Sequence, residues 1–191
     1  MKRIACSRVA LTVLLLAVGM NLAQAQPADT VTSPAASKLT PEEYNFVAQA
    51  NLGAPFQVDS GRIAEDKATT AAIRDYAHLM VTSHIPVVDA LNKILQRKGL
   101  TAPPNTLLQG AYHAMIASLK ADNRAALDRD YVEGQVEYQK GNAALFQNEI
   151  QNGTDPDLKE FARATLPKIE DHLQRAQKLA KNGKFGTTAS R

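Results

Sequence analysis

The chain has 191 residues, of which 45% are hydrophobic, so it is long and apolar enough to build one packed domain. Its formal net charge of +3 would favour a nucleic-acid partner. However, three of the 22 basic residues, Lys2, Arg3 and Arg8, lie in a predicted signal peptide that has no acidic residue. Without them, 19 basic residues face 19 acidic ones. The mature chain is then neutral, and we expect no nucleic-acid binding.

Residues 1–25 have the three parts of a secretory signal peptide. A positive segment precedes an apolar stretch over residues 9–22, and Ala23-Gln24-Ala25 fits a cleavage site. The apolar stretch is shorter than the roughly 20 residues that a membrane-spanning helix needs. We therefore expect cleavage before Gln26, no transmembrane span in the mature chain, and a periplasmic or secreted protein. Cleavage also removes Cys6, the only cysteine, and with it any disulfide or thiolate metal ligand.

The mature chain is predicted to be all-α, because its apolar residues recur with a period near 3.6. We expect a flexible linker over residues 26–39, a helical domain over 40–182, and a disordered basic tail over 183–191. The helices are predicted at 41–67, 70–98, 105–152 and 156–182, with the third broken near Asp122 and Asn123. Thr40 and Glu43 fit a capping box at the first helix. Long helices with short connections favour an up-down-up-down four-helix bundle.

Each predicted helix can direct one polar side chain toward the bundle core. His84 follows Ile73, Ala77 and Met80 on the apolar stripe of the second helix, and His172 lies on the stripe of the last. Gln139 falls inside the stripe of the third helix, and Gln57 lies beside that of the first. The sequence thus predicts a central polar layer of Gln57, His84, Gln139 and His172.

Two interpretations of this layer remain open. Histidine and glutamine side chains can satisfy one another by hydrogen bonding, without a metal. Alternatively, His84 and His172 are ligands of an iron, manganese or zinc ion, since helical bundles build metal sites from inward-facing side chains. Glutamine is a poor ligand for such ions, and the Glu-x-x-His pattern of di-iron bundles is absent, because Val81 and Ile169 precede the histidines by three residues. We therefore predict no cofactor and keep the metal as the alternative.

The C-terminal segment, residues 173–191, carries five basic residues and no acidic one. Cations at the C-terminus of a helix are favoured by its macrodipole. A weak contact with an anionic component of the cell envelope is the other interpretation. The sequence identifies no partner beyond this. The five residues are Arg175, Lys178, Lys181, Lys184 and Arg191.

Residues 41–180 resemble a bacterial family of exported proteins called domain of unknown function forty-one forty-two (DUF4142). The most specific segments are Met80-Val-Thr-Ser-His84 and Leu166-Pro-Lys-Ile-Glu-Asp-His172. The resemblance implies a ferritin-like bundle, and family members are often labelled predicted outer membrane proteins. The family pattern usually has Glu at Gln57, Asp at Ser83 and His at Gln139, so this chain lacks most ionisable members of the central site.

The motifs of common enzyme classes are absent from the sequence: it has no G-x-S-x-G, no phosphate-binding glycine loop and no H-E-x-x-H. We therefore expect a non-catalytic binding or structural module of the cell envelope. The alternative is a ferritin-like redox or metal-storage protein that uses the central histidines.

Overall fold

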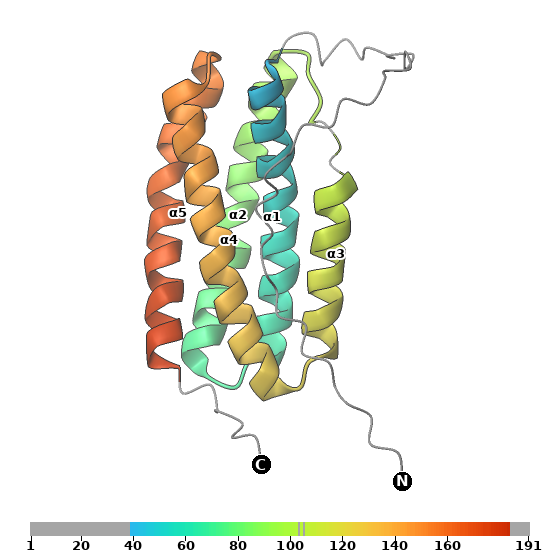
Figure 1. Cartoon of the computed structure of the whole chain (residues 1–191), viewed down its shortest axis with the longest axis vertical. Helices are drawn as coiled ribbons and strands as arrows, with labels where there is room; N and C mark the ends of the chain where they lie inside the picture. The colour runs from blue at the N-terminus through green and yellow to red at the C-terminus, as the bar shows by residue number, and fades with distance from the viewer. Residues whose placement is uncertain (1–38, 103, 105, 184–191) are drawn as a thin grey trace, which may run out of the picture. The chain divides into compact units, whose positions relative to one another are not determined.

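Five α-helices make up the part of the chain that the structure describes, a computed structural model covering residues 39–102, 104 and 106–183 (Figure 1). All of these residues belong to one unit, Thr32–Arg191. No strand occurs among them, which confirms the predicted all-α bundle. The predicted signal peptide, nearly all of the linker and most of the basic tail lie outside the described residues. The helices are α1 (Pro41–Lys67), α2 (Ala71–Arg97), α3 (Thr106–Ala121), α4 (Arg124–Asn152) and α5 (Pro156–Asn182).

Short polar residues and glycines set the helix ends, as their positions in the sequence predict. At the start of α1, the Thr40 side chain accepts a hydrogen bond from the Glu43 backbone N–H, and the Glu43 carboxylate accepts one from Thr40 N–H. Asp155 caps α5 through bonds from two backbone N–H groups of its first turn. Gly99 follows α2 with φ of 64°, a left-handed conformation that favours glycine at a helix end.

Two helical hairpins pair to form the bundle. The helices α1 and α2 pack along each other, as do α4 and α5, and further contacts of α1 with α4 and of α2 with α5 close the four-helix arrangement. The shorter α3 packs mainly against α1 and has little contact with α4. Figure 1 shows α3 at the side of the bundle. The helices α1, α2, α4 and α5 therefore enclose the core, and α3 packs on the outside of α1.

The path of the chain through the middle of the sequence differs from the predicted third helix. The break at Asp122 and Asn123 is where it was expected, but α3 and α4 run in opposite directions from it (Figure 1). Asn123 has an extended backbone, with φ −70° and ψ 161°, and caps α4 by accepting from Ala126 N–H. Because of this reversal, α2 and α4 run in the same direction (Figure 1). In an up-down-up-down bundle, these two consecutive bundle helices would be antiparallel.

The core consists of two apolar clusters, and every bundle helix contributes to both. The first cluster lies at the α4–α5 turn and includes Phe46 and Phe146, whose ring centroids are 5.0 Å apart. The second lies toward the other end and includes Met80 and Tyr131. Along each helix, the residues of one cluster are separated from those of the other by two to four turns. The polar layer falls in that interval.

Among residues 39–102, 104 and 106–183, no helix has both the length and the apolar character that crossing a membrane requires.

Gly61 marks the closest approach of α1 to α2, and replacing it provides a test of this packing. A Cβ at Gly61 would lie 2.8 Å from Val81 Cγ2 and 2.9 Å from the Ala77 backbone oxygen. We expect Gly61→Ala to lower the free energy of unfolding by about 1–3 kcal/mol, because the two backbones must separate. Urea denaturation of the purified domain measures this change.

The matched control is Gly141→Ala in α4, where a Cβ would meet nothing within 4 Å. This variant should be more stable by about 0.5–1 kcal/mol, since alanine is the better helix former. Equal effects of the two substitutions would contradict the close approach at Gly61.

Candidate functional site

The four polar residues predicted to face the core are all buried in the bundle. Gln57 in α1 and Gln139 in α4 have 0% relative exposure, and His84 in α2 and His172 in α5 have 5%. In α2, for example, His84 stands between Met80 of the second apolar cluster and Leu91 of the first. The layer is therefore a polar section through an otherwise apolar core.

Gln135, one turn before Gln139 in α4, connects the glutamine half of the layer. Its Nε2 donates to Gln57 Oε1 at 2.7 Å, and its Oε1 accepts from the Tyr76 hydroxyl at 3.4 Å. Gln139 Nε2 lies 3.5 Å from both Gln135 Oε1 and Met80 Sδ, at the long limit of hydrogen bonding. The side chain of Gln135 thus joins α1, α2 and α4.

The two histidines form the other half of the layer. Their ring centroids are 5.4 Å apart, with the ring planes tilted by 41°. Ser83 Oγ donates to the Leu79 carbonyl at 2.6 Å and lies 3.4 Å from His172 Nε2. With the single hydroxyl proton on Leu79, this contact is a hydrogen bond in the tautomer of His172 that carries its proton on Nε2, and Nδ1 is then an acceptor.

A tyrosine links the two halves across α2 and α5. The Tyr76 hydroxyl lies 3.3 Å from the backbone oxygen of His172 and 3.4 Å from Gln135 Oε1, so its one proton is shared between these two acceptors. Burial raises the pKa of Tyr76, so this phenol stays protonated and serves as a donor. Hydrogen bonds therefore connect all four bundle helices in one layer.

Both histidines are neutral at physiological pH. Burial, together with the neighbouring His172, lowers the pKa of His84 to about 3. Burial also lowers the pKa of His172 to about 4, although Asp171 acts in the opposite direction. The layer is thus composed of uncharged groups, and it offers neither a buried carboxylate nor an imidazolium for acid–base chemistry.

Four polar atoms of the layer have no hydrogen-bond partner in the described part of the chain. His84 Nε2 and His172 Nδ1 are ring nitrogens, and Gln57 Nε2 and Gln139 Oε1 complete the set. A buried polar atom without a partner costs about 1–3 kcal/mol. These atoms are where a small polar ligand would gain most from entering the layer.

The donor set does not fit a conventional transition-metal centre. Within the described residues, no group of three or more His, Cys, Asp or Glu side chains is placed to hold a metal ion. The two histidines are ligands of the right kind, but the other members of the layer are amides, a serine and a methionine. Asp59 and Glu137, carboxylates close to the layer in sequence, are on the bundle surface.

Sequence reasoning missed two members of this layer, Tyr76 and Gln135, whereas the family resemblance had already placed Ser83 at the central site. Gln135 lies four residues before Gln139, so helical spacing contained a signal for it. Tyr76 was hidden because an aromatic side chain on an apolar stripe is normally explained by packing alone.

A separate pocket of about 160 Å³ lies where α1, α3 and α4 meet. Tyr112 of α3 stacks on Phe56 of α1 at a centroid distance of 4.5 Å. The Tyr138 hydroxyl reaches under Gly53, where a Cβ would come within 2.1 Å of it. Ligand pockets for drug-sized molecules are larger, about 300–1,000 Å³, so this one suits only a small molecule. It is lined by Gln49, Tyr112, Glu137, Tyr138, Gly141, Asn142 and Leu145.

Comparison with known proteins gives one family and one similar fold. The family described as Domain of unknown function (DUF4142) matches residues 28–179. The crystal structure of a DUF305 fragment from Deinococcus radiodurans is similar in fold, with a TM-score of 0.67 and 14% sequence identity. The match covers 76% of this chain and 99% of that fragment. No curated protein matches. At this level of identity, the structural likeness concerns the fold alone.

Gln135 is the residue through which the hydrogen bonds of the layer can be tested. In Gln135→Leu, Gln57 and Tyr76 lose a partner, and we expect the free energy of unfolding to fall by about 1–3 kcal/mol. Chemical denaturation at pH 7.5 measures the change. Gln147→Leu on the exposed side of the same helix is the control, expected within about 0.5 kcal/mol of the parent. An unchanged stability of Gln135→Leu would show that these bonds contribute nothing.

The buried histidines should make the protein sensitive to acid. Their folded-state pKa values lie below the unfolded value of 6.5, so the unfolded chain binds the protons more readily. Their contribution is present above pH 6.5 and is lost as pH falls, by up to about 2 kcal/mol per histidine at pH 5.

Replacing both histidines by glutamine removes the titrating groups while retaining hydrogen-bonding side chains. The stability of His84→Gln/His172→Gln relative to the parent should therefore rise steadily from pH 7.5 to pH 5. His113→Gln, at an exposed position in α3, should show no such trend. Parallel pH profiles for parent and double variant would disprove the neutral buried pair.

Proposed function

Starting from the fact that this chain belongs to the DUF4142 family of domains of unknown function, we propose that it is a non-catalytic binding or structural module of the cell envelope. The observation that carries this proposal is the uncharged polar layer. It joins α1, α2, α4 and α5 through Gln57, Tyr76, Gln135 and the backbone of His172. A layer of this kind fixes how the helices align, because any shift along a helix axis leaves buried polar atoms without partners.

The pocket beside α3 supports the binding part of the proposal. Its lining combines the Tyr112 and Tyr138 rings with the amides of Gln49 and Asn142 and the carboxylate of Glu137. Apolar walls with a few polar groups are the usual composition of a small-molecule site. The polar layer itself is nearly closed to solvent, so an exchangeable ligand is more easily admitted at the pocket.

Export to the periplasm or the medium is proposed on the sequence of residues 1–25. The positive segment, the apolar stretch and the Ala23-Gln24-Ala25 site together support cleavage. Attachment to an anionic component of the envelope through residues 173–191 is proposed on the basic residues alone. Three of them, Arg175, Lys178 and Lys181, lie in the last turns of α5, where the helix dipole also favours cations.

A metal-binding role remains the second candidate, and one observation favours it. His84 Nε2 and His172 Nδ1 are buried without a hydrogen-bond partner in the described residues, on rings 5.4 Å apart. Both rings are neutral, as metal binding requires. Such a site would need ligands besides the two histidines. Binding a metal would give both buried ring nitrogens a partner.

One preparation tests the proposed function and its alternative. The full chain is expressed in a bacterium and recovered from the periplasmic fraction, and its intact mass is compared with that of a chain beginning at Gln26. Metal content is then measured by elemental mass spectrometry after dialysis. We expect the mass of the cleaved chain and less than about 0.1 metal ion per chain, because two histidines alone form an incomplete first shell.

The matched variant is His84→Ala/His172→Ala. Iron, manganese or zinc near one ion per chain in the parent, lost in this variant, would establish the alternative and refute a purely structural layer. A chain that keeps Met1 and stays in the cytoplasm would refute export.

A further inference from the structure

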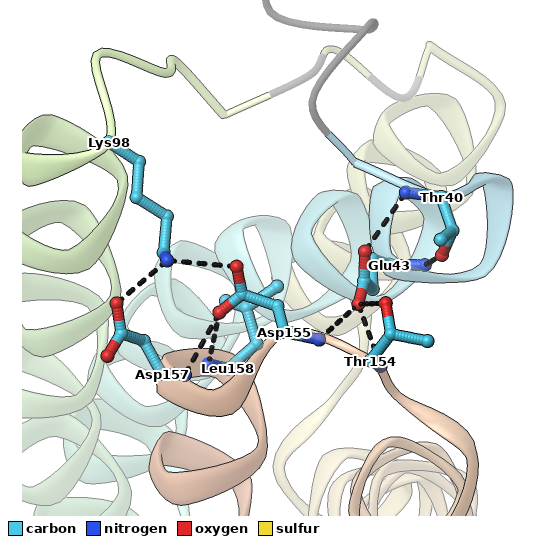
Figure 2. Close-up of polar contacts among 7 residues, drawn as sticks. All are labelled: Thr40, Glu43, Lys98, Thr154, Asp155, Asp157 and Leu158. Carbon is cyan, nitrogen blue, oxygen red and sulfur yellow. Dashed lines mark hydrogen bonds and ion pairs between the residues drawn. The ribbon is translucent and has the colours of Figure 1, made fainter.

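A buried glutamate ties α1 to the turn between α4 and α5. Glu43 is 2% exposed, and its Oε1 accepts hydrogen bonds from Thr154 N at 2.9 Å, Thr154 Oγ1 at 2.8 Å and Asp155 N at 2.6 Å. Its Oε2 accepts from Thr40 N at 3.0 Å. Figure 2 shows the Glu43 carboxylate between Thr40 and the Thr154–Asp155 segment. We call these contacts the Glu43 clamp.

Ion pairs of Lys98 also connect the Glu43 clamp to the end of α2. Lys98 Nζ lies 2.9 Å from Asp155 Oδ2 and 2.8 Å from Asp157 Oδ2, and Figure 2 shows it between the two carboxylates. Asp155 Oδ1 meanwhile accepts from the N–H groups of Asp157 and Leu158. Three carboxylates, Glu43, Asp155 and Asp157, are therefore gathered at this end of the bundle.

A fourth carboxyl group, that of Glu149, is buried beside them. Glu149 lies in the last turns of α4, is 2% exposed, and its Oε1 has no hydrogen-bond partner in the described residues. The side chain folds over the end of α4, since a Cβ at Gly153 would lie 2.2 Å from Glu149 Oε1. A negative charge there faces the C-terminal end of the helix dipole, which disfavours anions.

A metal ion does not fit between these carboxylates. Both oxygens of Glu43 already accept hydrogen bonds, and one oxygen of Asp155 caps α5 while the other meets Lys98. No metal-holding group of three side chains is found in the described part of the chain. Lys159 of α5 is an opposing charge, but its effect on Glu149 is smaller than those of burial, Glu43 and Asp155, so Glu149 is neutralised by binding a proton.

We propose that Glu149 is a proton-operated latch: its protonated carboxyl is part of the closed α4–α5 turn, and loss of that proton loosens the Glu43 clamp. The ionised carboxylate would face Glu43 of α1 and Asp155 of the turn, with Lys159 of α5 as the opposing charge. Lys98 of α2 is already engaged with Asp155 and Asp157. The turn would yield because the ionised Glu149 repels the Glu43 carboxylate, which holds the turn by accepting from the N–H groups of Thr154 and Asp155.

The ionisation behaviour of the two glutamates agrees with this arrangement. Burial, together with the charges of Glu43 and Asp155, raises the pKa of Glu149 to about 7. Burial also opposes ionisation of Glu43, but its hydrogen bonds to Thr40, Thr154 and Asp155 outweigh this and lower its pKa to about 2. Because the folded-state pKa of Glu149 lies above its usual 4.5, its contribution to stability is present below pH 4.5 and is lost as pH rises through about 7.

The experiment compares the parent with Glu149→Gln, which imitates the protonated carboxyl at every pH. The unfolding equilibrium constant of each is measured by urea denaturation between pH 4.5 and pH 8. The ratio of the two constants should change by on the order of 100-fold in favour of Glu149→Gln across this range. Because a ratio is taken, the acid titration of the histidines cancels. Gln151→Ala, exposed on the same helix, changes no titrating group and should give a ratio independent of pH.

A direct titration makes the test independent of any variant. In the folded parent, the side-chain carboxyl ¹³C resonance of Glu149 and the amide resonances of Gly153, Thr154 and Asp155 should titrate together with a midpoint near pH 7. Amide hydrogen exchange at these three residues, corrected for its intrinsic pH dependence, should accelerate above that midpoint. A Glu149 midpoint near 4.5, or a pH-independent stability ratio for Glu149→Gln, would overturn the latch.

Discussion

The constraint on which this structure depends is that polar side chains buried in an apolar core can bond only to one another and to the backbone around them, which leaves four atoms of the layer without a partner among the described residues. The apolar clusters on either side of the layer are non-directional and would tolerate small shifts of the helices. Hydrogen bonds do not tolerate such shifts, because they depend on distance and direction. The bonds of Gln135 to Gln57 and Tyr76 connect three helices through one side chain. The alignment of the bundle is therefore set by its polar section rather than by its larger apolar volume.

The end of the bundle at the α4–α5 turn holds charged side chains, whereas the central layer is uncharged. The central layer keeps two histidines neutral by burial, whereas the α4–α5 turn holds the ionised Glu43 by backbone hydrogen bonds. A helix end can hold a carboxylate because its first N–H groups have no partners within the helix. The middle of a bundle offers no such groups. The two regions are accordingly predicted to affect stability in opposite ways. The histidines should destabilise the fold as pH falls, and Glu149 should destabilise it as pH rises.

The similarity to the DUF305 fragment at 14% identity shows that this bundle is reached by very different sequences. Here three amides, a tyrosine and a serine stand beside the histidines, and the acidic residues lie on the surface and toward the helix ends. The function of this chain must be sought in those residues and in the pocket that α3 creates, because the fold by itself serves no particular chemistry.

The sequence by itself determined the helices and most of their ends. The capping box at Thr40, the Asp155 cap and the glycines after α2, α4 and α5 act within one or two turns, so local spacing contains the information. The same 3.6-residue period placed Gln57, His84, Gln139 and His172 on inward faces. Such features need no knowledge of the partner helices.

Only the tertiary structure decided how those faces meet. That α3 turns back along α1 depends on contacts between residues far apart in sequence, and the break at Asn123 is equally compatible with either direction. The choice of Gln135 and Tyr76 as connecting residues, and the burial of Glu149 against Gly153 beside Glu43, likewise arise from three-dimensional packing. Hydrogen bonding and desolvation depend on distances between helices, and a one-dimensional pattern does not contain those distances.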